Sequence, residues 1–232
     1  MKITDIQNKI KTDLTSVLSE NGFIFIDSAF YRHETDLIKI IHLQHPNKHM
    51  ASYFGTNTAS FFICLGILYN FIPLDHKIAK DKDKKKLLPK DYECHIRKTL
   101  FRDFEQKIVK KPNVIDKDDM KTIKIISKWF FEKFLNIKSE KNECLLDNDQ
   151  NGKDIWYVEK DGSNLDFIIA NAKKVILEEG IEWFNKFSDL SYTYKYLQEK
   201  PENAYETFGF GKKGSLIRNR LLECFVKKIN NK

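Results

Sequence analysis

The stretch from Asn21 to Asn70 decides the fold of this chain, because it reads as the start of an antiparallel sheet. It opens with Gly22-Phe23-Ile24-Phe25, continues with Phe30-Tyr31-Arg32, and leads into two long apolar segments, 37–45 and 59–70. The two aromatic runs are close enough in sequence to form a hairpin. Both long segments are rich in β-branched residues and apolar on both faces, which predicts central strands rather than edge strands.

The segment before this sheet predicts an amphipathic helix over residues 3–21. Its apolar side chains recur at helical spacing, and Asn21-Gly22 supplies a stop signal. The apolar positions are Ile3, Ile6, Ile10, Leu14, Val17 and Leu18. One face of this helix is therefore expected to pack on the sheet.

Downstream of the two long apolar segments, the pattern predicts one more strand and then mainly helices. A short strand is expected at Tyr92–Arg97, and a long amphipathic helix is expected from about Asp118 to Ile137. The chain from Gly162 onward is helical in pattern, with breaks near Gly180, Pro201 and 209–211.

These elements predict a single α+β domain over residues 1–232. The sheet part covers about 1–105 and has roughly four to six strands. The helical part covers about 115–232 and packs on the sheet. No internal repeat and no long low-complexity linker separates two independent units.

Composition favours a folded protein of the cytoplasm. Hydrophobic residues make up 41% and aromatic residues 13%, more than a disordered chain would carry, despite a charged fraction of 31%. The N-terminus has no continuous apolar core of the kind found in signal peptides. The longest apolar run, Phe61–Leu68, is too short for a membrane span, which needs about 20 residues.

Four cysteines lie far apart in the sequence and include no CxxC pair. They are Cys64, Cys94, Cys144 and Cys224. This spacing favours reduced thiols over a disulfide framework or a zinc site, and Cys64, Cys94 and Cys224 are expected to be buried. No metal site and no cofactor are predicted.

Basic residues are concentrated in two segments of this chain, whose net charge is +7. Residues 212–232 hold seven basic residues against Glu223, and residues 80–90 hold six lysines against Asp81 and Asp83. Such segments can contact phosphate groups and gain affinity by releasing counterions, although lysine-rich loops also serve simply to keep a protein solvated. The candidate nucleic-acid-binding residues are Lys82, Lys84, Lys85, Lys86, Lys212, Lys213, Arg218 and Arg220.

Three short motifs stand out in the sheet part: Phe30-Tyr31-Arg32, Ile41-His42-Leu43-Gln44, and Cys94-His95-Ile96-Arg97 followed by Leu100. These motifs resemble the landmarks of a bacterial family, domain-of-unknown-function family 4304. The later segment Ile181-Glu182-Trp183-Phe184, followed by Phe187-Ser188-Asp189-Leu190, is similar to the C-terminal helical part of that family. The resemblance implies an α+β fold with an antiparallel sheet and no established activity. The lysine-rich loop and the basic tail depart from the shorter family pattern.

Five polar residues are candidates for one cluster on the sheet. Alternate residues of a strand share a face, so His42 lies with Gln44, and His95 lies with Arg97. If the two strands pair suitably, these four side chains meet, with Arg32 nearby. Arginine and histidine together suit a phosphate or a carboxylate. The same residues can also form a hydrogen-bonded structural network, which is the favoured interpretation.

Two loops carry weaker signals. Residues 147–152, Asp-Asn-Asp-Gln-Asn-Gly, begin like a calcium-binding EF-hand loop, but the twelfth position is Val158 instead of a glutamate. A turn before Ile155 is therefore favoured over a calcium site. Residues 209–215 lack the spacing of a phosphate-binding loop and favour the start of a last helix with Ser215 as its N-cap.

The sequence favours a non-enzymatic protein-interaction domain of the bacterial cytosol, and no catalytic residue is assigned. Tyr192, Tyr194 and Tyr196 alternate in a polar helical stretch, so at least one must face solvent or a partner. A setting in immunity or defence rests on the family resemblance alone. Two alternatives remain open: a nucleic-acid-associated protein that uses the basic loop and tail, and a phosphate-handling enzyme built on His42, His95 and Arg97. The oligomeric state is not predicted.

Overall fold

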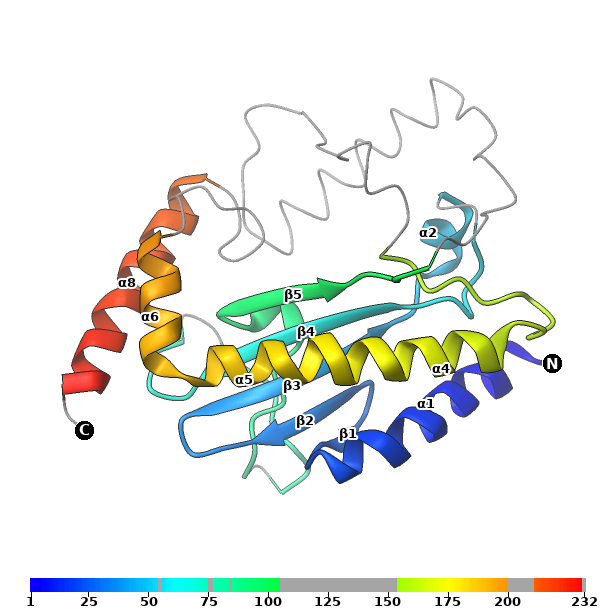
Figure 1. Cartoon of the computed structure of the whole chain (residues 1–232), viewed down its shortest axis with the longest axis horizontal. Helices are drawn as coiled ribbons and strands as arrows, with labels where there is room; N and C mark the ends of the chain where they lie inside the picture. The colour runs from blue at the N-terminus through cyan, green and yellow to red at the C-terminus, as the bar shows by residue number, and fades with distance from the viewer. Residues whose placement is uncertain (54–55, 75–76, 84, 105–153, 200–210, 231–232) are drawn as a thin grey trace.

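The computed structural model describes residues 1–53, 56–74, 77–83, 85–104, 154–199 and 211–230. For Tyr53 and residues 211–218, only the backbone is described. Within these ranges the chain forms a five-stranded antiparallel sheet with helices packed on one face (Figure 1). The predicted α+β class is confirmed. The helix expected at 118–137 and the acidic loop at 147–152 lie outside the described residues.

The N-terminal helix α1 (Ile3–Glu20) forms as its sequence predicts. The Asp5 side chain accepts a hydrogen bond from the Lys2 backbone N–H at 3.3 Å, which satisfies one free donor at the helix start. The helix ends where Gly22 adopts a φ of 77°, a left-handed conformation that glycine tolerates without strain. Its buried face carries Ile6, Ile10, Leu14 and Leu18.

The sheet is a meander in which each strand pairs antiparallel with the next. The strands are β1 (Ile24–Ile26), β2 (Ala29–His33), β3 (Leu37–Gln44), β4 (Phe62–Tyr69) and β5 (Ile96–Leu100), in the order β1-β2-β3-β4-β5. The two long apolar strands β3 and β4 are interior to the sheet, as predicted. A short helix, α2 (Lys48–Tyr53), lies in the connection between them.

The last strand begins later than its sequence suggested. The segment 92–97 was expected to be extended, but Asp91–Glu93 form a single 3₁₀ turn, η1, and β5 starts at Ile96. The Lys90 backbone N–H donates to the Glu93 carboxylate at 2.7 Å, and the Cys94 N–H donates to the Asp91 carbonyl at 3.1 Å. These local hydrogen bonds close a turn where a strand would leave the same groups to a neighbour.

One long helical stretch crosses the sheet. It consists of α4 (Leu165–Val175), the π-helical turn η2 (Ile176–Gly180) and α5 (Ile181–Ser188), which follow one another without interruption (Figure 1). The break expected at Gly180 is therefore absent. A Cβ atom added at Gly180 would lie 3.4 Å from Leu100 Cδ1 and 3.6 Å from Leu65 Cδ1. Both distances are ordinary van der Waals contacts, so the helix packs against β4 and β5 at this point without requiring a glycine.

Two further helices, α6 (Leu190–Glu199) and α8 (Gly211–Asn230), lie side by side at one end of the sheet (Figure 1). Ser215 lies inside α8 and is not its N-cap. The Tyr69 ring packs edge-on against Phe225 with 4.8 Å between centroids, and its hydroxyl donates to the Phe187 carbonyl at 2.7 Å. Tyr69 therefore connects the end of β4 to α5 and to α8.

The apolar interior has two layers. The larger layer fills the space between the helices and the sheet and includes Phe30, Ile41, Leu65 and Trp156. The smaller layer lies on the opposite face, where the chain between β4 and β5 covers part of the sheet. Its buried members are Ala29, Tyr31, Ile38, Ile40, Leu68, Ile78 and Leu88.

Candidate functional site

Polar side chains continue the smaller apolar layer along the sheet. On β3, His42 and Gln44 share a face with Ile38 and Ile40, as the alternation of the strand predicted. This face is opposite to the one that carries the long helix. Because the long helix lies on the other face, His42 and Gln44 face the segment that connects β4 to β5.

His42 and Gln44 both bind one carboxylate oxygen of η1. The distance from His42 Nδ1 to Asp91 Oδ1 is 2.6 Å, and the distance from Gln44 Nε2 to the same oxygen is 2.8 Å. An ionised carboxylate only accepts hydrogen bonds, so Nδ1 of His42 is the donor. The Asp91 side chain is 10% exposed and the His42 side chain 12% exposed, so water screens this contact weakly.

Sequence reasoning missed Asp91. The residue lies in a short polar turn, 49 positions from His42, and no spacing rule links it to β3. The only available signal was its place shortly before the Cys94-His95 motif, and that motif was interpreted as part of a strand. The structure thus adds to the polar cluster a carboxylate that the sequence did not indicate.

Gly66 explains how Asp91 reaches the sheet. A Cβ atom at position 66 would lie 2.5 Å from Cys94 Sγ and 3.3 Å from Asp91 Cα. Real Cβ atoms do not approach other atoms that closely, so only glycine lets η1 lie directly on β4. Because Gly66 of β4 has no side chain, η1 packs close enough for the Asp91 carboxylate to bind His42 and Gln44 of β3.

Cys64 lies next to this network, but its thiol has low reactivity. It is directly opposite His42 in the β3–β4 register and opposite Thr99 in the β4–β5 register. Burial, and then the nearby Asp91 carboxylate, raise the pKa of the Cys64 thiol to about 12. Burial also raises the pKa of the Cys94 thiol well above its usual value. Both thiols are thus poor nucleophiles near neutral pH.

The expectation that Cys64, Cys94 and Cys224 are buried is corrected in part. Cys64, Cys94 and Cys224 are each half-buried, and none of the three forms a disulfide with another described cysteine. Each of these residues keeps some surface in contact with solvent. Cys144 lies outside the described residues.

Two of the five predicted cluster residues bind elsewhere. Arg32 is paired in register with Lys39 on the helix-covered face, where its Nε lies 2.9 Å from Glu34 Oε1. His95 Nδ1 accepts a hydrogen bond from the Tyr69 backbone N–H at 2.9 Å. The sheet register therefore separates Arg32 from His42, and His95 is engaged by the end of β4.

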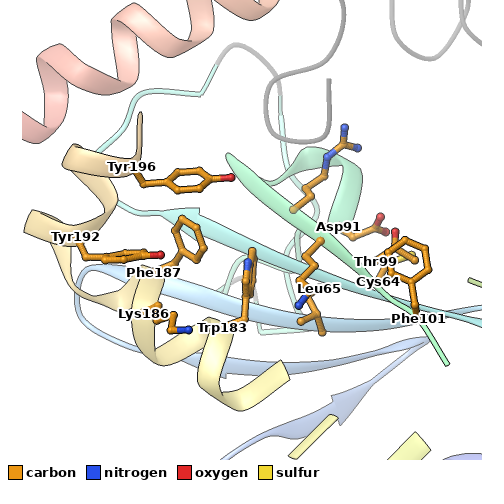
Figure 2. A pocket seen from close by; sticks show the side chains of 12 residues that line it. Cys64, Leu65, Asp91, Thr99, Phe101, Trp183, Lys186, Phe187, Tyr192 and Tyr196 are labelled. Carbon is orange, nitrogen blue, oxygen red and sulfur yellow. The ribbon is translucent and has the colours of Figure 1, made fainter. Parts of the chain in front are cut away.

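The fifth residue, Arg97, lines a pocket of about 550 Å³ at the edge of β5 (Figure 2). Arg97 has no hydrogen-bond or ion-pair partner among the described residues. By contrast, Lys98 Nζ lies 3.4 Å from Glu179, and Lys186 Nζ lies 2.7 Å from Glu182. The pocket is lined by Cys64, Leu65, Asp91, Arg97, Lys98, Thr99, Phe101, Trp183, Lys186, Phe187, Tyr192 and Tyr196.

The lysine-rich loop is a small hairpin closed by a β-bridge between Lys80 and Leu87. Asp81 Oδ1 accepts hydrogen bonds from the backbone N–H groups of Lys85 and Lys86 at 2.8 and 3.0 Å. The side chains of Lys82, Lys85 and Lys86 are exposed. Lys84 lies outside the described residues, and Lys212, Lys213 and Arg218 belong to the part of α8 described by its backbone alone. Arg220 is half-buried.

The described part of the chain contains neither a metal-binding cluster nor a membrane-spanning helix. No group of three or more histidine, cysteine, aspartate or glutamate side chains there is arranged to hold a metal ion. None of the described helices combines the length and the apolar composition that crossing a membrane requires. The calcium-like loop at 147–152 is not among these residues.

Comparison with known proteins gives one match. A family model described as a domain of unknown function (DUF4304) matches residues 14–186. The chain belongs to this family. The matched region begins within α1 and ends within α5, so it includes all five strands, η1 and the His42–Asp91 contact. The resemblance seen in the sequence motifs is confirmed. No curated protein and no solved structure matches the chain.

Proposed function

We propose that this chain is a protein-interaction domain whose pocket at the edge of β5 receives an extended segment of a partner protein. The observation that carries the proposal is the alternation of the pocket lining along the strand. Arg97, Lys98 and Thr99 are consecutive and point to alternate faces of the sheet, yet all three line the same pocket. The pocket therefore follows the edge of β5 and does not lie over one face.

The backbone of β5 provides the first element of recognition. In the sheet order β5 is the last strand, paired with β4 on one side and with no strand among the described residues on the other. An edge strand presents unpaired N–H and C=O groups that another extended chain can bind. Addition of a peptide strand to such an edge is a common mode of protein recognition.

Aromatic side chains from α5 and α6 provide the second element. Trp183 and Phe187 of α5 and Tyr192 and Tyr196 of α6 stand along one side of the pocket, opposite β5 (Figure 2). Tyr192 is 41% exposed, which agrees with the expectation that a tyrosine of this stretch faces solvent or a partner. Tyrosine and tryptophan are enriched where proteins bind one another.

Charge favours an acidic group in the partner. Lys98 and Lys186 are each paired with a glutamate of the chain, whereas Arg97 has no such partner among the described residues. A guanidinium presents a planar fork of donors that fits a carboxylate. We therefore expect an extended segment that carries apolar side chains and an aspartate, a glutamate or a C-terminal carboxylate.

The experiment is a selection of short random peptides on the purified chain, followed by binding measurements with variants. Trp183→Ala and Tyr196→Ala should each weaken the selected peptides about tenfold or more, because central aromatic residues carry much of the binding energy of an interface. Phe167→Ala is the matched control, since Phe167 is 56% exposed and does not line the pocket. Equal binding by all three variants would remove the proposal.

Photo-crosslinking identifies the natural occupant. A photoreactive amino acid in place of Tyr192 should link the chain to a partner in extracts of the native host, and the same replacement at Phe167 should not. A link within one chain, or between two copies, would show that the chain fills its own pocket. A role in bacterial immunity or defence is a further hypothesis, and the identity of the linked partner tests it.

A further inference from the structure

We infer that Ser28 is a nucleophile activated by His42 and Asp91. Ser28 and His42 do not line the pocket at β5, whereas Asp91 also does. The Ser28 Oγ lies 3.4 Å from His42 Nε2, and His42 Nδ1 lies 2.6 Å from Asp91 Oδ1. The three side chains come from the β1–β2 turn, from β3 and from η1. The serine, the base and the group that orients the base thus form one hydrogen-bonded chain.

The direction of each hydrogen bond suits this role. Because Asp91 accepts the proton of Nδ1, the neutral imidazole leaves a lone pair on Nε2, the nitrogen that faces Ser28. That nitrogen can take the hydroxyl proton. Gln44 binds the same oxygen of Asp91 and keeps the carboxylate in place. Serine, histidine and aspartate occur in this order of contacts on several unrelated folds, where they are recognised by geometry and not by sequence.

The local fold presents the serine to solvent and protects the other two groups. Ile26 pairs with Ala29, so Asp27 and Ser28 form a two-residue turn, and Asp27 adopts a φ of 56°. Ser28 is exposed. The side chains of His42 and Asp91 are only 12% and 10% exposed. A Ser–His distance of 3.4 Å is typical of an arrangement that tightens when substrate binds.

The chemistry that fits is acyl transfer from a carboxylic ester. Ser28 Oγ forms a bond to the carbonyl carbon while its proton moves to His42 Nε2. The bond between that carbon and the leaving oxygen then breaks, and the leaving alcohol takes the proton from His42. A water molecule next attacks the acyl-serine and gives a proton to the same nitrogen. Ser28 Oγ recovers this proton as the carboxylic acid leaves.

A serine-directed fluorophosphonate tests the reactivity of the full-length chain. The phosphorus should bond to Ser28 Oγ with loss of fluoride, at a rate about a hundredfold above that of Ser16. Ser16 is an exposed serine on α1 whose hydroxyl donates to the Asp13 carbonyl, so it is an internal control without a base. Mass spectrometry of peptides measures both rates in one sample. Equal labelling of the two serines would overturn the inference.

Variants separate activation from simple exposure. Asp91→Asn keeps an oxygen for His42 and Gln44 but removes the charge, so labelling of Ser28 should fall by at least about tenfold in a chain that remains folded. His42→Ala should abolish fast labelling, and added imidazole should restore part of it. Ser28→Ala removes one exposed hydroxyl and should abolish hydrolysis of a nitrophenyl ester with no change in melting temperature. Unchanged labelling in Asp91→Asn, or unchanged hydrolysis in Ser28→Ala, would contradict the inference. Neither result bears on the proposed peptide binding, which is measured separately with the Trp183→Ala and Tyr196→Ala variants.

Discussion

His42 Nδ1 and Asp91 Oδ1 are 2.6 Å apart, although 49 residues separate them in the sequence. The contact joins the centre of the sheet to η1, which otherwise belongs to the connection between β4 and β5. Both side chains are largely shielded from water, so the bond stabilises the packing of that connection more than an exposed ion pair would. The same bond orients the histidine toward Ser28.

Asp91→Ala should destabilise the fold by about 1–3 kcal/mol, because it leaves the His42 and Gln44 donors without their shared acceptor. Urea unfolding gives the value. Asp91→Asn retains an oxygen acceptor and should cost less than half as much. If the two variants lose equal stability, the negative charge and not the hydrogen bonding holds η1 in place.

Gly66→Ala should destabilise the fold by about 1–3 kcal/mol, because the new methyl group overlaps Cys94 Sγ and forces η1 away from β4. Cys94→Ala removes the nearest atom. The double variant should therefore be more stable than the sum of the two single changes predicts. Strict additivity would show that the clash is relieved elsewhere.

The sequence predicted the fold better than the site, and the reason is physical. Apolar periodicity is a local property, so the 3–21 helix and the two long strands could be read directly from residues that are neighbours in the chain. The contact of His42 with Asp91 depends on how η1 packs on the sheet. That packing depends in turn on Gly66 of β4. No short-range pattern records that dependence.

The restriction to local patterns also explains why only part of the predicted polar cluster forms. Alternation correctly placed His42 beside Gln44, because both are in one strand. It could not place Arg32, since its face depends on the register between β2 and β3. It also could not foresee that the Tyr69 backbone would bind His95.

Alkaline pH should weaken the fold through Cys64. Its folded pKa of about 12 lies above the usual 9.0, so the thiol is protonated in both states at neutral pH and contributes no pH dependence there. Above pH 9 the unfolded thiol ionises and the folded one does not, so stability falls with rising pH until about pH 12. The loss approaches about 1.4 kcal/mol per pH unit for one such group. Urea unfolding at pH 8 and pH 10 should show a shallower loss in Cys64→Ala, and an identical loss would disprove the assignment to Cys64.

Nucleic-acid binding is the prediction that follows from the lysine hairpin. If the lysines of this segment contact phosphate, Lys84→Glu, Lys85→Glu and Lys86→Glu together should abolish binding to mixed-sequence DNA or RNA. Affinity of the unmodified chain should fall steeply as salt rises, because bound counterions are released. Fluorescence anisotropy at several salt concentrations measures both effects. Absence of salt-sensitive binding by the unmodified chain at low ionic strength would exclude this function.

Replacing His95 and replacing Arg97 should change the free energy of unfolding differently, although the sequence placed both residues in one cluster. His95→Ala leaves the N–H of Tyr69, a fully buried residue, without its acceptor, so the fold should lose about 1–3 kcal/mol. Arg97→Ala breaks no hydrogen bond or ion pair of the described chain, so the free energy of unfolding should stay within about 0.5 kcal/mol.

Binding then separates the roles of these two residues. Peptides selected on the unmodified chain should bind Arg97→Ala more weakly, because the pocket loses a cation that has no ion-pair partner among the described residues. They should bind folded His95→Ala almost normally. A melting temperature that drops equally in both variants would show that Arg97 supports the fold, and the acidic group expected in the partner would then have no basis.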